Sequence, residues 1–199
     1  MRMVKAFPVV VFALAAGAAI TTAQEKSGGG KGKGKGGGIP APLMLTVMGY
    51  SDGGAIPSKF GCMGGQNAGV SPAISWTGAP AGTMSFAVIF HDTDVALPNG
   101  DDVLHWAIFD IPGSSTGLPE SVAKTATLPD GSVQMNNIAG MPGYFNPCPP
   151  PPTVHHYIYD VYALDNKLGL PATTTRADLL KAMQGHVRAK GTYVGTYHQ

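Results

Sequence analysis

The chain has 199 residues, of which 44% are hydrophobic and 13% are charged, so wholesale disorder is excluded and the length fits one domain. Its 28 glycines and 17 prolines exclude a coiled coil or a helical bundle, because both residues interrupt helices. Residues 1–38 hold six basic residues and one acidic residue, whereas residues 39–199 hold seven basic and eleven acidic ones. A mildly acidic body with a basic tail argues against nucleic acid as a partner.

Residues 1–23 have the pattern of a secretory signal peptide. Arg2 and Lys5 form a positive start, an apolar stretch of about twelve residues follows, and Ala23 offers a small residue for cleavage. This stretch is short for a membrane-spanning helix, and a retained anchor is the alternative. We therefore expect a secreted or periplasmic protein.

Residues 24–39 form a Gly/Lys-rich segment in which Lys31, Lys33 and Lys35 alternate with glycine. Such a segment has little to bury and predicts a flexible linker. It is either a solvated spacer or a weak contact for an anionic membrane surface. The folded domain is expected over residues 40–199.

The body shows short β-rich runs separated by turns rich in Gly, Pro, Asn and Asp. These runs predict strands at residues 44–48, 73–76, 85–90, 104–110, 155–164 and 192–197. One helix is predicted over 176–184, with Thr175 as its N-cap and Gly185 as its stop. The prediction is a mainly β domain, a Greek-key sheet or sandwich, with a minor C-terminal helix.

The sequence contains two cysteines, Cys62 and Cys148. In an exported protein, an even pair predicts a disulfide, and two separate buried thiols are the alternative. Closing a loop of this length would stabilise the fold by at most about 4.5 kcal/mol in the chain-entropy model.

Two of the predicted strands carry histidine. Alternation along 155–164 places His155 and Tyr157 on one face and His156 on the other. Along 104–110, the same rule places His105 on the face of Phe109.

Two carboxylates follow a third strand. Asp92 and Asp94 come directly after the apolar run that ends at Phe90, and both point the same way if the chain stays extended there. Two histidines, a tyrosine and two aspartates near strand ends have three interpretations. They bind an anion through imidazole and phenol donors, hold a metal through nitrogen and oxygen ligands, or satisfy buried polar neighbours.

Residues 113–117 match the G-x-S-x-G pattern of hydrolases. That pattern needs a strand before it and a helix after it. Here Leu118 and Pro119 follow with no helical signal. We interpret the segment as a loop.

Several segments carry recognisable motifs in a fixed order. They read NAGVSPAISW at 67–76, DTDVA at 92–96, HW at 105–106, IP at 111–112, PCPP at 147–150, HHY at 155–157 and YALD at 162–165. Together they resemble the phosphatidylethanolamine-binding protein family, whose bacterial members are called Raf kinase inhibitor-like proteins. The resemblance runs from about residue 44 to 198.

This resemblance implies a β-sheet core with a small pocket for phosphate or a phospholipid headgroup. The positions that match the family's pocket motifs are Asp92, His105, His155 and Tyr157, with Cys148 on the rim and Asp94 as a brace for the loop. His156 stands where the family's H-R-Y motif has arginine.

The sequence therefore predicts an exported binding protein that is not an enzyme and has no cofactor, with any protein partner left open. One alternative is a metal-dependent hydrolase that uses Asp92, Asp94, His105 and His155. Another is an inhibitor or partner-binding module whose pocket is vestigial.

Overall fold

A computed structural model describes residues 42–62 and 69–199. The expected signal peptide (1–23), the expected linker (24–39) and the start of the first motif at Asn67 lie outside the described residues. Within the described ranges, no helix is long and apolar enough to cross a membrane.

The described chain is built mostly from strands, which confirms a mainly β fold with one minor C-terminal helix. The elements are β1 (Met44–Val47), β2 (Gly54–Ala55), the 3-10 helix η1 (Ser58–Phe60), β3 (Ile74–Thr77), β4 (Ser85–Ala96), β5 (Asp102–Pro112), β6 (Gly117–Leu118), β7 (Val133–Gln134), β8 (His155–Leu164), α1 (Arg176–Met183) and β9 (Val187–Tyr197). Three strands of two residues, β2, β6 and β7, were not predicted, because so short a run has no periodicity to read.

The strands form two sheets. The larger has the order β2-β9-β8-β4-β5-β7 and the smaller the order β1-β3-β6. All pairings are antiparallel except β2 with β9. Strands β8-β4-β5-β7 lie in the fourth-first-second-third order of a Greek key, although the chain enters the small sheet as β6 between β5 and β7.

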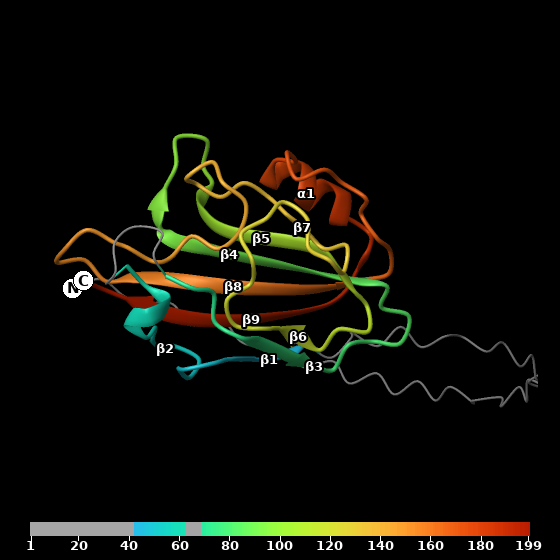
Figure 1. Cartoon of the computed structure of the whole chain (residues 1–199), viewed down its shortest axis with the longest axis horizontal. Helices are drawn as coiled ribbons and strands as arrows, with labels where there is room; N and C mark the ends of the chain where they lie inside the picture. Colours follow the sequence, from blue (N-terminus) through green and yellow to red (C-terminus); the bar gives the residue numbers. More distant parts are fainter. Residues whose placement is uncertain (1–41, 63–68) are drawn as a thin grey trace, which may run out of the picture. The chain divides into compact units, whose positions relative to one another are not determined.

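The large sheet separates two apolar cores, and Figure 1 shows α1 on one side of it and β1, β3 and β6 on the other. On β4, Phe86, Val88 and Phe90 belong to the core shared with the small sheet. Ala87 and Ile89 belong to the core under α1. Strict alternation along a strand buried on both faces produces these two layers.

The helix begins and ends where its sequence signals lie. The Thr175 hydroxyl oxygen accepts a hydrogen bond from the Asp178 backbone N–H at 3.2 Å. Leu179 and Met183 are buried against the sheet. Gly185 has a φ of 80°, which favours glycine after a helix end.

Candidate ligand-binding site

A β-bulge turns His105 toward the face of the sheet that is shared with the small sheet. Phe90 pairs with Trp106, but the next residue, His91, pairs with Leu104, so His105 is an extra residue in β5. Bulges of this kind bend a strand and redirect a side chain. The prediction that His105 shares a face with Phe109 was therefore wrong, because alternation assumes an unbroken register.

His155, the first residue of β8, is held by a carboxylate from β4. Its Nδ1 lies 2.7 Å from Asp92 Oδ2, and both side chains are buried. The other oxygen, Asp92 Oδ1, accepts the backbone N–H of Asp94 at 2.9 Å. A carboxylate only accepts, so Nδ1 of His155 carries the hydrogen and Nε2 is the ring nitrogen left for a ligand.

His105 is held in the same way by a carbonyl group. Its Nδ1 lies 2.9 Å from the backbone oxygen of Phe145 and therefore donates. Its ring stands edge-on to Tyr157, with ring centroids 5.2 Å apart and an interplanar angle of 89°. His155 and Tyr157 follow the predicted alternation, with ring centroids 6.4 Å apart.

These side chains meet around one cavity of about 180 Å³. The described residues that line it are Asp92, Val95, Val103, His105, Ile138, Phe145, Cys148, Pro149, Pro150, His155 and Tyr157. Five of the six residues predicted for the ligand site are thus brought together by four separate segments of the chain.

Asp94, which the family resemblance implied as a brace for the loop, is the exception. It does not line the cavity; its Oδ2 lies 3.0 Å from His156 Nδ1 and also accepts the His156 backbone N–H. The pairing of β4 with β5 loses its register between Asp92 and Ala96, so the two carboxylates diverge. Asp94 instead ties β4 to β8 beside the cavity, as a brace.

Comparison with known proteins identifies the family. The sequence profile described as phosphatidylethanolamine-binding protein matches residues 48–198. The chain belongs to the phosphatidylethanolamine-binding protein family. This confirms the family suggested by the sequence motifs.

Related proteins cover nearly the whole domain of this phosphatidylethanolamine-binding protein (PEBP) family member. A UPF0098 protein of Methanothermobacter thermautotrophicus is 43% identical over 150 residues, which are 75% of this chain and 95% of the relative. The crystal structure of Escherichia coli YbcL, described as a member of the mammalian PEBP family, aligns with a TM-score of 0.70 at 29% identity. That alignment covers 80% of this chain and 99% of YbcL.

The rim of the pocket in this PEBP family member is tied to the rest of the domain by a disulfide. Cys62 and Cys148 are bonded, with Cα atoms 5.3 Å apart. Asn146, two residues before Cys148, fixes the preceding part of the rim. Its Oδ1 accepts a hydrogen bond from the Gly69 backbone N–H at 3.2 Å. A Cβ on Gly69 would lie 2.6 Å from the Asn146 Cβ, so this close approach requires glycine.

Burial sets the protonation of two pocket groups. It lowers the pKa of His105 below its ordinary value, against the raising effects of the Phe145 carbonyl and Asp92. Burial also raises the pKa of the Tyr157 phenol, and the charge of Asp92 raises it further. At neutral pH the pocket therefore holds a neutral His105 and a protonated phenol.

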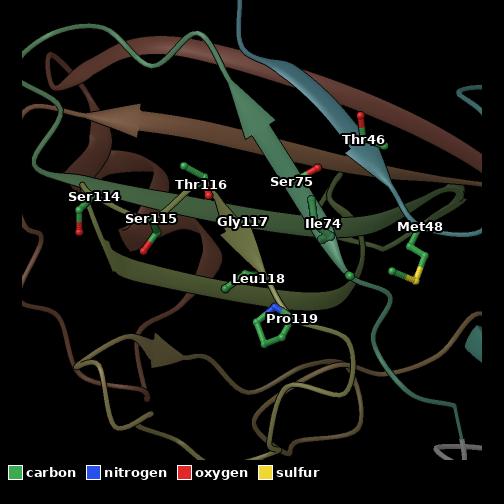
Figure 2. Close-up of a pocket in the computed structure, with 11 residues that line it drawn as sticks. Thr46, Met48, Ile74, Ser75, Ser114, Ser115, Thr116, Gly117, Leu118 and Pro119 are labelled. Atoms are coloured by element: carbon green, nitrogen blue, oxygen red, sulfur yellow. The ribbon is translucent and has the colours of Figure 1, made fainter.

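A larger groove of about 670 Å³ lies over the small sheet and the loop before β6 (Figure 2). The described residues that line it include Ser114, Ser115 and Thr116 from the G-x-S-x-G segment, but no histidine or acidic residue. That segment is a turn followed by β6 instead of a helix, so it lacks the setting of a nucleophile elbow.

The alternative in which Asp92, Asp94, His105 and His155 hold a metal ion is not matched by the geometry of these side chains. Across residues 42–62 and 69–199, no group of three or more His, Cys, Asp or Glu side chains is placed to hold a metal ion. Asp94, one of the four proposed ligands, points to His156 outside the cavity.

Sequence reasoning missed four lining residues, Val95, Val103, Ile138 and Phe145. Ile138 and Phe145 come from the segment between β7 and β8, where the Ile138 N–H donates to the Leu104 carbonyl and the Phe145 N–H donates to the His105 carbonyl, at 3.0 and 2.9 Å. No local motif marks such long-range pairs. Only the position of Phe145 just before the proline-rich rim was a signal.

Proposed function

We propose that this PEBP family member binds a phosphate-type anion, free or as part of a phospholipid headgroup, in the cavity around His105 and His155. The observation that carries the proposal is shared by both histidines. The Nδ1 of His105 bonds to the Phe145 carbonyl oxygen and the Nδ1 of His155 bonds to Asp92 Oδ2. In each ring, Nε2 is therefore the nitrogen available to a ligand in the small cavity beside Tyr157.

The pocket's size and chemistry suit a headgroup and not a larger ligand. A cavity of about 180 Å³ is below the range of about 300–1,000 Å³ typical for drug-sized ligands. Imidazole and phenol groups hydrogen-bond phosphate oxygens. Ile138, which lines the cavity, is half exposed, so the mouth also offers apolar surface to a substituent on the phosphate.

We propose binding without turnover. Among the described lining residues there is no serine, threonine or free thiol, because Cys148 is bonded to Cys62. The remaining hydroxyl belongs to Tyr157, and burial keeps it protonated. Without an activated nucleophile, hydrolysis through a covalent intermediate has no starting group.

We also propose that the protein is exported to the periplasm or the cell exterior. The signal-peptide pattern of residues 1–23 supports this, and so does the Cys62–Cys148 disulfide, because structural disulfides persist in oxidising compartments. In that setting, Lys31, Lys33 and Lys35 of the expected linker support weak contact with an anionic membrane surface. The acidic body gives no support for a nucleic-acid partner.

Calorimetric titration of the metal-free full chain with inorganic phosphate and with phosphoethanolamine tests the binding proposal. We expect saturable binding that His155→Ala abolishes. The matched control is His156→Ala, which changes the neighbouring, exposed histidine outside the cavity and leaves binding intact. Undetectable binding by the unaltered chain, or full binding by His155→Ala, would contradict the proposal.

A further inference from the structure

One wall of the pocket is a proline-rich segment that no sheet holds. Residues 147–152, the rim segment, contain five prolines, which have no backbone N–H, so the segment has a single backbone donor, at Cys148. It lies outside every strand of the described chain. Cys148, Pro149 and Pro150 nevertheless line the cavity. The contacts that hold the rim segment therefore hold one side of the site.

The single N–H of the rim segment is used toward the pocket. The Cys148 backbone N–H donates a hydrogen bond to the Tyr157 phenol oxygen, and the phenol hydroxyl donates to the Asp92 carboxylate. Asp92 in turn holds the His155 ring at 2.7 Å. A displacement of the rim segment therefore reaches the side chains that are proposed to meet the ligand.

Gln199, two residues after β9, holds the other side of the rim segment. Its Nε2 donates to the Pro149 carbonyl oxygen at 2.6 Å and lies 3.5 Å from Cys148 Sγ. Gln199 itself does not line the cavity. Tyr197, the last residue of β9, pairs with His155 in the large sheet. Because of this pairing, the amide donor comes from a strand that is fixed beside the site.

The disulfide anchors the neighbouring rim residue near the same end of β9. Cys148 is bonded to Cys62. Gly61, next to Cys62, has no room for a Cβ, because the Tyr197 ring lies there. The disulfide and the Gln199 amide thus fix two consecutive residues of the rim segment, 148 and 149.

Of these two anchors, the hydrogen bond is the one that opens reversibly without a chemical reaction. Gln199 is exposed, so water replaces the Pro149 carbonyl as its partner and no buried polar group is left unpaired on the glutamine. The pairing of β8 with β9 does not depend on this contact. The rim segment therefore has a way to move locally while the sheet stays folded.

We infer that Gln199 is a positioning residue for ligand binding: its amide N–H latches the rim segment against the cavity, and the latch slows the release of a bound anion. This rests on the proposed function and adds a control on ligand exchange to it. The latch acts through the rim segment and its link to Tyr157, because Gln199 does not reach the ligand.

Gln199→Met removes the amide, keeps the length of the side chain and adds no charge. We expect phosphoethanolamine to dissociate from the full-chain variant about three- to tenfold faster, the effect of one lost hydrogen bond, and the affinity to fall by a similar factor. NMR exchange measurements give the dissociation rate and calorimetry the affinity. The matched control is Gln184→Met, which changes an exposed glutamine at the end of α1 that does not line the cavity, and it should leave both values unchanged.

Gln199→Lys tests whether the donor is what matters. Lysine keeps an N–H donor on a flexible chain of similar length, so slow dissociation should return. The comparison is made in about 0.5 M salt, where the added charge is largely screened from the anion. In the ligand-free protein, the NMR signals of the Tyr157 ring should shift in Gln199→Met and return toward their original positions in Gln199→Lys.

The outcomes separate the latch from the site. Unchanged dissociation in Gln199→Met, an equal acceleration in Gln184→Met, or no recovery in Gln199→Lys overturns the latch and leaves the anion site standing. Undetectable binding of phosphoethanolamine and of inorganic phosphate by the unaltered chain overturns the proposed function, and the latch falls with it.

Discussion

His91 Nδ1 lies 2.6 Å from Asp102 Oδ2 on the face of the large sheet opposite the pocket. The other ring nitrogen, Nε2, lies 3.7 Å from Asp160 Oδ2 on β8. Arg176, the first residue of α1, holds the second oxygen of Asp102. These contacts join β4, β5, β8 and the helix directly behind the bulge that aims His105.

Replacing His91 should therefore weaken ligand binding although His91 does not line the cavity. In His91→Phe, Asp102 loses the hydrogen bond that crosses from β4 to β5, and we expect about tenfold weaker phosphoethanolamine binding, or about 1.4 kcal/mol. Calorimetry measures the affinity, and the NMR signals of the His105 ring report its position. His91→Asn keeps an N–H donor and should restore part of the affinity.

His186→Phe is the matched control for His91. Its Nδ1 also pairs with a carboxylate, Asp165 Oδ1 at 2.8 Å, but its side chain is 44% exposed and it does not line the cavity. We expect unchanged affinity. If His91→Phe lowered thermal stability yet bound the ligand as tightly as the unaltered chain, the link between this cluster and the pocket would be refuted.

Asp92→Asn should impair the pocket without changing its size. Asp92 accepts two hydrogen bonds on two oxygens, from Asp94 N–H and from His155 Nδ1–H, whereas asparagine has one oxygen. One donor is then left unpaired, which costs about 1–3 kcal/mol of stability. We expect weaker phosphate binding and altered nitrogen chemical shifts of the His155 ring in NMR spectra; unaltered shifts and affinity would speak against this orienting role.

The Cys62–Cys148 bond should stabilise both the fold and the rim. It closes a sequence separation of 86 residues, and the double variant Cys62→Ser with Cys148→Ser should lose about 2–4.5 kcal/mol of unfolding free energy. Urea denaturation measures the loss. Reduction of the unaltered protein should shift the midpoint in the same direction; an unmoved midpoint in both experiments would disprove the prediction.

Asp160 should make the fold sensitive to acid. Burial alone would raise the pKa of its carboxyl, but the hydrogen bond from Thr192 and the ion pair with Lys190, with the His91 ring nearby, outweigh burial and hold the pKa below its ordinary value. Because the pKa of Asp160 is lower in the folded chain than in the unfolded chain, the ionised carboxylate stabilises the fold. This stabilisation is complete at a pH above the unfolded-state pKa and is lost as the pH falls to the folded-state pKa.

Thermal unfolding between neutral pH and about pH 2 tests the role of Asp160. Asp160→Asn should unfold at a lower temperature at neutral pH and lose less stability on acidification than the unaltered chain. The comparison variant is Asp178→Asn, whose carboxylate is exposed at the start of α1 and accepts a hydrogen bond from the Thr175 hydroxyl. Parallel pH curves for all three proteins would show that Asp160 does not carry the acid sensitivity.

The sequence alone determined what depends on local order. Strand β8 covers residues 155–164 as predicted, and alternation along it correctly paired His155 with Tyr157. The start of α1 followed from Thr175 and the turn after it from Gly185. Period-two patterning and helix capping act within a few residues, so the sequence displays them directly.

Only the tertiary structure decided the arrangement around His105. The bulge in β5 depends on how that strand pairs with β4, and the Phe145 carbonyl that fixes the ring comes from 40 residues away. Asp92 and His155, which hydrogen-bond at 2.7 Å, are 63 residues apart in the chain. Register and long-range pairing result from packing the whole sheet, and no local pattern of residues encodes which carboxylate or carbonyl a given imidazole will meet.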